Sequence, residues 1–384
     1  MGEVAEIVGG GTPSTGISEY WGGDIDWYSP AEIGNQIYVT ESQKKITEFG
    51  LQKSSAKILP VGTVLFTSRA GIGNTAILAK QGSTNQGFQS ILPRENILDS
   101  YFIFSRTNEL KKYGEVTGAG STFVEVSGKQ MAQMPIRIPS FDEQRKIGTF
   151  FKQLDDTITL HQRKLEQLEL LKRALLQKLF PKTGETVPEL RFRGFNESWE
   201  QSKWIDTVDM STNMVNPKTG EYDNLPHIGP GNIESFSGRL LDNVKSVKED
   251  NLISGKFKFY SGDIIYGKIN PQLAKYVHID FEGLASADAY ILNSKKGMVQ
   301  EFLYTILQTK NFYNYSVSVS MRTGMPKINR DELNQYNFLS PSKSEEQIKL
   351  GDLFKKIDET IALHQRKING YQQFKKSLLA KMFI

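Results

Sequence analysis

The stretch Leu160-His161-Gln162-Arg163-Lys164 occurs a second time in this chain of 384 residues, as Leu363-His364-Gln365-Arg366-Lys367. The shift between the two copies is 203 positions (363 − 160), and it holds without a gap from 143–180 onto 346–383. Roughly half of the positions in the two segments are identical, a match that chance does not produce over such a length. The chain therefore contains an internal repeat, which has to be identified before any fold is assigned.

Each copy of the repeat predicts one long helix. Apolar residues recur in both at alternating steps of four and three, which is the 3.5-residue period of a coiled-coil seam. A serine followed by acidic residues begins each copy and suits the positive end of a helix dipole, and Pro181 ends the first helix. We expect the seam to contain Leu154, Ile158, His161, Leu165 and Leu168 in the first copy, and Ile357, Ile361, His364, Ile368 and Tyr371 in the second.

Polar residues interrupt the seam at the same places in both copies, at His161 with His364 and at Lys172 with Lys375. If the helices pair antiparallel with full overlap, the two histidines meet near the middle of the seam. A functional interpretation makes them a pH switch or a pair of ligands. The interpretation that we favour is structural, because polar residues inside a seam set its register at some cost in stability.

The sequence outside the repeat is of another kind, rich in Gly, Ser, Thr, Asn and aromatic residues, with short alternating runs. We expect strands at 61–67, 134–138 and 263–268, and helices at 99–113 and 296–312. The predicted fold is therefore mixed α/β, with two globules separated by two long helices. The predicted segments are a globule at 1–140, a helix at 141–181, a linker at 182–188, a globule at 189–341 and a helix at 342–384.

The composition limits the classes of protein to which the chain can belong. It has 47 basic and 43 acidic residues, a net charge of +4, which permits a polyanionic partner without requiring one. It has no Cys, which excludes disulfides and thiolate metal sites, and only 4 His. No apolar run approaches the length of a membrane span, and the first residues lack a signal-peptide pattern. We expect a soluble, cytoplasmic protein without a membrane partner.

Several motifs accompany the repeat: Gly10-Gly11-Thr12-Pro13-Ser14, Tyr20-Trp21, Asn85-Gln86-Gly87-Phe88, Glu143-Gln144, and Pro188-Glu189-Leu190-Arg191-Phe192 with Trp199. With these motifs the chain resembles the specificity subunit of a type I DNA restriction–modification system over nearly its whole length. The resemblance implies two target-recognition domains, each reading half of a split site in double-stranded DNA. It also implies that the two helices pair antiparallel as a spacer. The lead-in at 188–199 has no counterpart ahead of the first domain in this sequence.

The resemblance further implies partner proteins. Methyltransferase subunits, which we expect to be two and to use S-adenosylmethionine, dock on the helices. Restriction and translocase subunits that use ATP and magnesium join the larger assembly. We expect no cofactor on this chain.

Base reading requires side chains with paired donors and acceptors, and phosphate contacts require cations or small hydroxyls. Such residues cluster beside glycine-rich turns in both globules. Our candidates in the first globule are Ser68, Arg69, Asn74, Asn85, Gln86, Ser121 and Thr122; in the second they are Lys256, Lys258, Lys268, Asn270, Gln272, Arg322 and Lys327. For any single candidate the alternative is an ordinary solvated loop residue.

The catalytic and cofactor motifs that the sequence partly resembles are incomplete. Gly71-Ile72-Gly73-Asn74 lacks the helix that a dinucleotide site needs, and Asn270-Pro271-Gln272-Leu273 lacks the second proline and the aromatic residue of an amino-methyltransferase motif. We therefore predict no catalytic residue and no metal site. Two other functions stay open at this stage: a coiled-coil adaptor whose globules bind protein or carbohydrate, and a fragment of a self-contained restriction enzyme.

Overall fold

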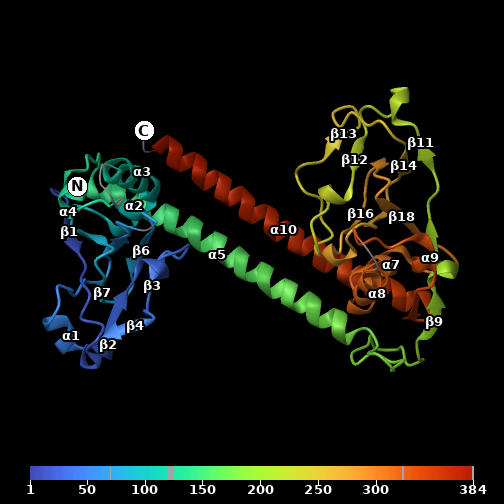
Figure 1. The fold of residues 1–384 in the computed structure, drawn as a ribbon, viewed down its shortest axis with the longest axis horizontal. Helices are drawn as coiled ribbons and strands as arrows, with labels where there is room; N and C mark the ends of the chain where they lie inside the picture. The colour runs from blue at the N-terminus through green and yellow to red at the C-terminus, as the bar shows by residue number, and fades with distance from the viewer. Residues whose placement is uncertain (70, 120–124, 322–323, 383–384) are drawn as a thin grey trace. The chain divides into compact units, whose positions relative to one another are not determined.

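The computed structural model describes residues 1–69, 71–119, 125–321 and 324–382. The chain divides into two compact units: unit 1 contains residues 1–160 and 368–384, and unit 2 contains residues 161–367. Each unit combines one globule with a section of both long helices, α5 (Phe141–Lys178) and α10 (Ser344–Met382) (Figure 1). The mixed α/β fold with two long helices is the one that the sequence predicts.

The first globule contains two sheets. The larger has the strand order β1 (Ala5–Gly9), β8 (Gln89–Pro93), β5 (Val64–Phe66), β6 (Thr75–Leu78) and β3 (Tyr38–Val39). The smaller has the order β4 (Lys44–Ile46), β2 (Trp21–Tyr28) and β7 (Ser83–Thr84). The helices are α1 (Glu48–Gln52), α2 (Ser100–Ser105), α3 (Thr107–Gly118) and α4 (Gly128–Gln133), with short 3-10 turns at Ser18–Tyr20 and Pro30–Glu32.

The second globule contains three sheets. One has the order β10 (Val208–Met210), β18 (Ala289–Ser294), β15 (Ile264–Gly267) and β16 (Tyr276–His278). Another has the order β11 (Met214–Val215), β14 (Lys256–Phe259), β17 (Gly283–Ala285), β12 (Pro226–Ile228) and β13 (Lys245–Ser246). A two-stranded sheet pairs β19 (Asn337–Ser340) with β9 (Glu200–Lys203). The helices are α6 (Trp204–Thr207), α7 (Gln300–Leu307), α8 (Lys310–Ser320) and α9 (Arg330–Asn334), with 3-10 turns at Pro217–Thr219, Pro230–Asn232 and Pro271–Leu273.

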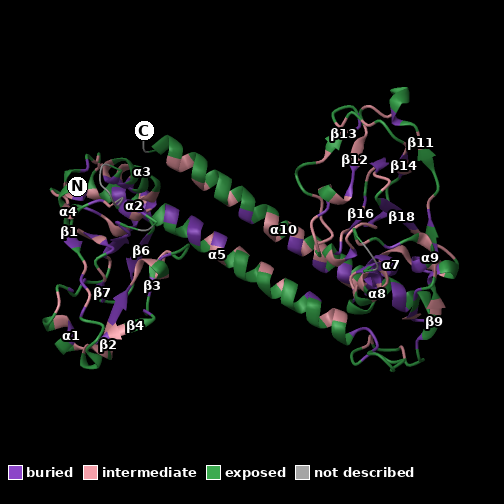
Figure 2. Ribbon diagram, viewed as in Figure 1, coloured by how far each residue is buried: buried purple, intermediate pink, exposed green. Residues whose placement is uncertain are grey.

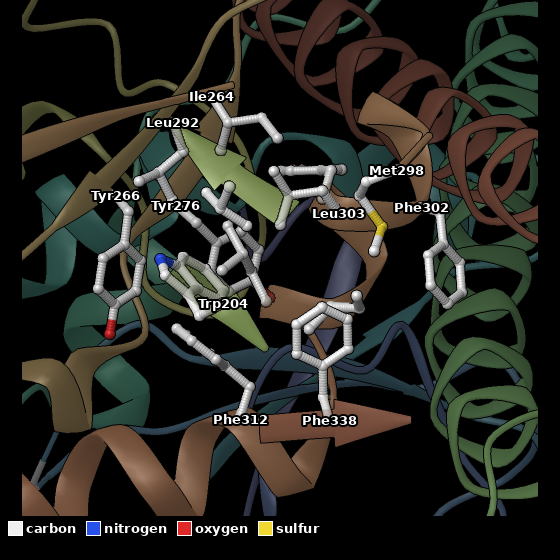
Figure 3. Close-up of a cluster of buried hydrophobic side chains, with 14 of the residues drawn as sticks. Trp204, Ile264, Tyr266, Tyr276, Leu292, Met298, Phe302, Leu303, Phe312 and Phe338 are labelled. Atoms are coloured by element: carbon white, nitrogen blue, oxygen red, sulfur yellow. The ribbon is translucent and has the colours of Figure 1, made fainter. Parts of the chain in front are cut away.

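Aromatic residues dominate the core of unit 2, which Figure 3 shows around Trp204. The ring of Trp204 stacks on Phe312 with the centroids 5.5 Å apart, and Phe338 meets it edge-on at 6.5 Å. The same buried cluster continues into Leu350, Phe354, Ile357 and Ile361 of α10. The second globule and α10 therefore share one hydrophobic core. Aromatic rings contribute much to this core because each of them buries a large apolar area.

Some predicted elements differ from the structure. The predicted helix at 99–113 is two helices that break at Arg106, and the one at 296–312 breaks before Thr309, whose hydroxyl accepts a hydrogen bond from the backbone of Phe312. The prediction of a strand at 134–138 is wrong. A strand needs a hydrogen-bonded neighbour, and no described strand lies beside this segment, whereas in the second globule β19 pairs with β9.

The long helices pair antiparallel, as the contacts within each unit establish. In unit 2, His161 contacts His364, and Lys172 contacts Asp358, so that residue numbers rise along one helix and fall along the other. In unit 1, Asp155 contacts Lys375, and Met382 lines the same groove as Glu143 and Ile147. Figure 2 shows the buried positions along the two helices interspersed with exposed ones, as expected for a seam.

A second pattern in the repeat attaches each globule to its helix. The Gln144 amide donates to the carbonyls of Ile97 and Pro139 (both 3.0 Å) and accepts from the backbone of Asp99 (3.1 Å). Its repeat partner Gln347 accepts from the backbone of Val299 (3.0 Å) and donates to the carbonyl of Pro341 (3.0 Å). The two globules are therefore attached to α5 and α10 in the same way.

Glycines make this attachment close. A Cβ atom at Gly148 would lie 2.6 Å from Asp99 Oδ1, and one at Gly351 would lie 2.6 Å from the Cβ and 2.9 Å from the carbonyl carbon of Glu301. Both glycines occupy the same position of the repeat and face the first turn of a globule helix, α2 or α7. Among the described residues, no helix combines the length and the apolar character needed to cross a membrane.

Candidate nucleic-acid interface

The predicted loops of the first globule converge. The backbone N–H of Ser68 donates to the carbonyl of Gly87 (2.8 Å), and the backbone N–H of Val126 donates to the carbonyl of Ser68 (3.1 Å). Thr67 and Phe88 form a β-bridge beside these bonds. The loops that begin at residues 67 and 84 are thus joined to the segment at 125–126, although they are distant in sequence.

Four of the candidate side chains in the first globule lie at least partly exposed on these loops. Arg69 is exposed and its Nε lies 2.8 Å from Glu125 Oε1. The Asn74 amide donates to the carbonyl of Ile33 (3.2 Å), Asn85 Oδ1 accepts from the backbone of Gly87 (2.8 Å), and Gln86 Oε1 accepts from Thr12. These contacts hold polar side chains in defined positions on one set of loops.

Of the other three candidates in the first globule, one is buried and two lie outside the described residues. Ser68 is fully buried, and its hydroxyl has no hydrogen-bond partner among the described residues, so the expectation that its side chain contacts DNA is corrected. The backbone bonds that draw the loops together also place this side chain inside the globule. Ser121 and Thr122 lie outside the described residues.

In the second globule the loop that follows β15 is held against the segment before α9. The backbone N–H of Asn270 donates to the carbonyl of Pro326 (2.8 Å), and that of Ile328 donates to the carbonyl of Lys268 (3.0 Å). Asn270 has a φ of +52°, a left-handed conformation that asparagine tolerates better than most residues. The structure therefore brings together three predicted positions, Lys268, Asn270 and Lys327.

Gln272 belongs to the same loop. Its side-chain N–H donates to Asn270 Oδ1 (3.4 Å), and its backbone carbonyl accepts from the Tyr313 hydroxyl (3.3 Å). The buried Gln272 Oε1 has no hydrogen-bond partner among the described residues. Tyr313 therefore braces the loop.

Three cations gather on this part of the second globule. Lys268 Nζ lies 5.6 Å from the centre of the Tyr290 ring, and the guanidinium of Arg330 lies 6.0 Å from the same ring. Burial lowers the pKa of Lys268, and the charges of Lys327 and Arg330 lower it further, while Asp288 acts in the opposite direction. Mutual repulsion among cations in one place is relieved by a polyanion such as a DNA backbone.

Arg330 was absent from the candidates derived from the sequence. It begins α9, directly after Asn329, whose side chain accepts from the backbone of Glu332 in a capping box. Its guanidinium donates to the carbonyls of Met210 (2.8 Å) and Ser211 (3.2 Å). The sequence Asn329-Arg330-Asp331-Glu332 is typical of a helix start and could have placed Arg330 in the first turn of a helix. Only the fold brings Arg330 beside Lys268.

The remaining candidates of the second globule are placed differently. Lys256 is buried, and its ammonium group donates to the carbonyl (3.0 Å) and the hydroxyl (2.9 Å) of Ser254, so its expected contact with DNA is corrected. Burial also lowers the pKa of Lys256, because it disfavours the charged form of the ammonium group. Lys258 is half-buried, with Nζ 5.6 Å from the Tyr222 ring and 5.2 Å from the Tyr260 ring. Arg322 lies outside the described residues.

The predicted seam positions are buried or half-buried throughout. Buried are Leu154, Ile158, Ile357, Ile361 and Ile368, and half-buried are His161, Leu165, Leu168, His364 and Tyr371. The Nδ1 atoms of His161 and His364 lie 2.8 Å apart. Partial burial lowers the pKa of His161, and the neighbouring His364, Lys367 and Lys164 lower it further.

The two lysines of the seam each have an acidic partner that was not among the residues predicted from the sequence. Lys172 Nζ lies 2.5 Å from Asp358 Oδ1, and Lys375 Nζ lies 2.6 Å from Asp155 Oδ1. Asp155 also accepts from the Tyr101 hydroxyl (2.8 Å). Because Asp155 and Asp358 are 203 positions apart, as Lys172 and Lys375 are, the repeat itself contained this information. Among the described residues, no group of three or more His, Cys, Asp or Glu could hold a metal ion.

Comparison with known proteins gives a consistent result. The family model for the type I restriction modification DNA specificity domain matches residues 1–170 and 199–371. The chain is 29% identical to the specificity subunit of the type I restriction enzyme MjaIX of Methanocaldococcus jannaschii, over 99% of this chain and 90% of that protein. It is 26% identical to the specificity subunit of the enzyme EcoDI of Escherichia coli, over 82% of this chain and 76% of that protein.

A solved structure has the same fold. It is the S subunit of a type I restriction–modification system from M. genitalium, which is 11% identical and superposes with a TM-score of 0.68. The match covers 100% of this chain and 94% of the other. At this level of identity the similarity concerns the fold.

Proposed function

This chain belongs to the type I restriction–modification DNA specificity family, and we propose that it is the recognition subunit of a type I restriction–modification complex. In this function the domain at 1–140 reads one half of a split DNA site, and the domain at 189–341 reads the other half. The helices at 141–181 and 342–384 form the spacer, and residues 182–188 link the two halves. Family membership supports this function and gives no support to an adaptor of proteins or carbohydrates.

The observation that carries this proposal is the repeated attachment of two unlike globules. Gln144 with Gly148 and Gln347 with Gly351 make the same contacts in units 1 and 2, while the loops of the two globules differ. A protein that recognises two different half-sites needs two domains with different loops, each attached to the helices in the same way. Each attachment is close enough to fix its domain firmly on the helix.

The DNA contacts that we propose follow from charge and exposure. In the second domain, Lys268, Lys327 and Arg330 supply phosphate contacts, and Asn270 presents an amide of the kind that reads adenine. In the first domain, Arg69, Asn74, Asn85 and Gln86 lie on joined loops. Ser68 and Lys256 are no longer among the proposed contacts, because both are buried.

Exposed apolar residues on α5 and α10 support the proposal that partner subunits bind to these helices. Leu160 and Leu171 on α5, and Leu363 and Phe374 on α10, have between 44% and 51% of their surface exposed. Each lies one residue before a polar seam position, and therefore on the same flank of its helix. Because Leu363 and Phe374 are the repeat counterparts of Leu160 and Leu171, the chain presents the same apolar flank twice.

We infer from this duplication that two copies of one partner bind, each through an apolar helix surface. The partners are the methyltransferase subunits, which supply methylation with S-adenosylmethionine. Restriction and translocase subunits that use ATP and magnesium complete the complex. The chain itself contributes recognition and the frame, and it acts in the cytoplasm, where DNA is accessible.

Selection of bound DNA from a random-sequence pool tests the proposed function, with the chain assembled with its methyltransferase subunits. The expected product is a bipartite site with one fixed gap, bound with an affinity that falls steeply as salt rises. The variant Lys327→Ala should weaken the salt dependence by the loss of about one phosphate contact. Lys218→Ala, an exposed lysine on another segment, is the matched control. Failure to enrich any site, or enrichment of a single undivided one, contradicts the proposal.

A further inference from the structure

Two adjoining cavities lie in unit 2 between α5 and the second globule. One has a volume of about 510 Å³ and the other of about 390 Å³, which are sizes typical of small-molecule sites. They form one continuous groove, because five residues line both of them: Arg173 and Leu176 of α5, and Phe236, Tyr276 and Gln308 of the globule. Every lining residue belongs to unit 2, so the groove is defined by that unit alone.

An exposed aromatic ring on a strained backbone forms one wall of the groove. Phe236 has 56% of its surface exposed and a φ of +63°, a left-handed conformation that bulky residues rarely adopt. Its backbone N–H donates to the carbonyl of Ala274 (3.1 Å), and its carbonyl accepts from the Tyr276 hydroxyl (3.1 Å). Its ring lies 5.5 Å from the ring of Tyr313. Backbone strain of this kind clusters at functional sites, and an exposed ring offers a flat face on which a planar ligand can stack.

The smaller cavity is lined by one donor and one acceptor that lack a hydrogen-bond partner among the described residues. Arg239 directs Nε and Nη2 at Glu234 (both 2.8 Å), and its buried Nη1 is the atom without a partner. Gln308 Nε2 donates to Asp358 Oδ2 (3.5 Å), and the buried Gln308 Oε1 is the acceptor without a partner. Leaving buried polar atoms unpaired costs free energy, so both atoms favour a ligand with the complementary groups. The edge of a nucleobase carries such a donor and acceptor side by side.

The larger cavity is positively charged. Arg173, Lys182 and Lys310 line it, and among the described residues no acidic one does. Lys182 pairs with Glu189 (3.2 Å), whereas Arg173 and Lys310 are exposed and form no ion pair with a described residue. In the smaller cavity, by contrast, acidic residues balance the cations. The larger cavity therefore favours an anionic group such as a phosphate, which guanidinium and ammonium groups bind well.

We propose that this groove binds a nucleotide, with the base in the smaller cavity and the phosphate in the larger one. The base stacks on the ring of Phe236, accepts a hydrogen bond from Arg239 Nη1 and donates one to Gln308 Oε1. Arg173 and Lys310 bind the phosphate. A free mononucleotide and an unpaired nucleotide of a DNA strand share this chemistry. The inference does not depend on recognition of a bipartite site, because neither source needs a specific sequence.

Calorimetric titration of the full chain tests the proposal. The probes are GMP, AMP, the two matching nucleosides and inorganic phosphate. We expect saturable binding of GMP or AMP that is about tenfold tighter than binding of the nucleoside or of phosphate, because only the nucleotide uses both cavities. Binding of inorganic phosphate as tightly as the nucleotide would overturn the proposal, since the base would then contribute nothing.

Two exposed residues of the groove provide variants that leave the core intact. Phe236→Gly removes the ring and suits the left-handed backbone, so it should weaken nucleotide binding about tenfold without lowering the urea midpoint of unfolding. Arg173→Ala should weaken binding of the nucleotide and leave binding of its nucleoside unchanged. Arg163→Ala, an exposed arginine of α5 outside the groove, is the matched control and should bind the nucleotide as the unchanged chain does. Unchanged nucleotide binding by Phe236→Gly would overturn the proposal.

A second titration distinguishes the two sources of the nucleotide. Tyr313 contacts the Phe236 ring and donates to the carbonyl of Gln272, so the groove adjoins the proposed DNA contacts. The probes are a fluorescently labelled duplex of arbitrary sequence with one unpaired nucleotide, and the same duplex fully paired. Tighter binding of the first duplex, lost in Phe236→Gly, identifies DNA as the source. Equal binding of both duplexes identifies the free mononucleotide if GMP or AMP binds, and overturns the proposal if neither does, whatever the outcome of the site selection.

Discussion

The imidazole Nδ1 atoms of His161 and His364 lie 2.8 Å apart, so one ring donates its proton and the other accepts it. The two histidines occupy the same position of the internal repeat. In an antiparallel pair of repeated helices, a residue contacts its own repeat counterpart only at the local two-fold axis that relates the two helices. The histidine pair therefore lies at the centre of the pairing between α5 and α10. The structural interpretation, in which the pair sets the register of the two helices, stays a prediction.

The pH dependence of helix pairing follows from this contact. The folded state lowers the pKa of His161 below its ordinary value of about 6.5, because burial, His364, Lys367 and Lys164 disfavour its charged form. An unfolded chain then binds more protons at low pH than the folded chain does, so His161 favours the folded state fully above about pH 6.5. This contribution is lost as the pH falls below that value. We expect the urea midpoint of the chain to drop more between about pH 7.5 and about pH 5 than that of His161→Gln. Equal drops would contradict the assignment.

The close approach of α7 to α10 makes Gly351 sensitive to substitution. A methyl group there would lie 2.9 Å from the carbonyl carbon of Glu301, and backbone cannot move aside as easily as a side chain. We expect Gly351→Ala to lower the free energy of unfolding by about 1–3 kcal/mol. Gly370→Ala on the same helix is the control, since no atom lies within 4 Å of its added Cβ, and it should stabilise by about 0.5–1 kcal/mol. Urea denaturation measures both, and a reversed order would contradict the proposed attachment.

Asp155 and Asp156 are neighbours with opposite roles. Asp155 is buried and accepts from the Lys375 ammonium and the Tyr101 hydroxyl, whereas the exposed Asp156 pairs with Lys152 one helical turn away. Asp155→Asn should lower the free energy of unfolding by about 1–3 kcal/mol, because it leaves a lysine charge poorly compensated in the seam. Asp156→Asn should change it by less than about 0.5 kcal/mol. Similar values for the two variants would show that the seam does not need this ion pair.

The duplicated apolar flank predicts the number of partner subunits that bind. Leu160→Lys and Leu363→Lys should each remove one of two bound methyltransferase subunits, and the double variant should remove both. The stability of the chain should be nearly unchanged, because both leucines are about half exposed. Mass measurement by light scattering of the assembled complex gives the stoichiometry. Gln162→Lys, on the opposite flank beside His161, is the control that should keep both subunits. Retention of two subunits by the double variant would contradict the inferred surface.

The seam was the part of the fold that the sequence predicted best. Its signal is local, a 3.5-residue period, and it is present twice, so chance similarity was excluded before any contact was known. The pairing of Asp155 with Lys375 could have been predicted from the same repeat, since both partners recur with the 203-residue shift.

The recognition loops were predicted less well, because burial and strand pairing depend on residues that are distant in sequence. Ser68 and Lys256 are residue types that often contact DNA, but the side chains of both are buried. The residues that bury them are distant in sequence, so no local pattern identifies them. The segment 134–138 has the alternation of a strand, but no strand in the described part of the chain pairs with it, whereas β19 pairs with β9. Arg330 was missed because only the fold places it beside the Tyr290 ring.

The gap between the two half-sites tests the central claim most directly. A seven-residue insertion in each helix beside the His161–His364 contact keeps the seam in phase and lengthens it by roughly 10 Å, about three base pairs of duplex. The selected DNA site should keep both half-sites and gain a longer gap. A gap of unchanged length, or a change in the bases of either half-site, would contradict the account of α5 and α10 as the element that sets the spacing.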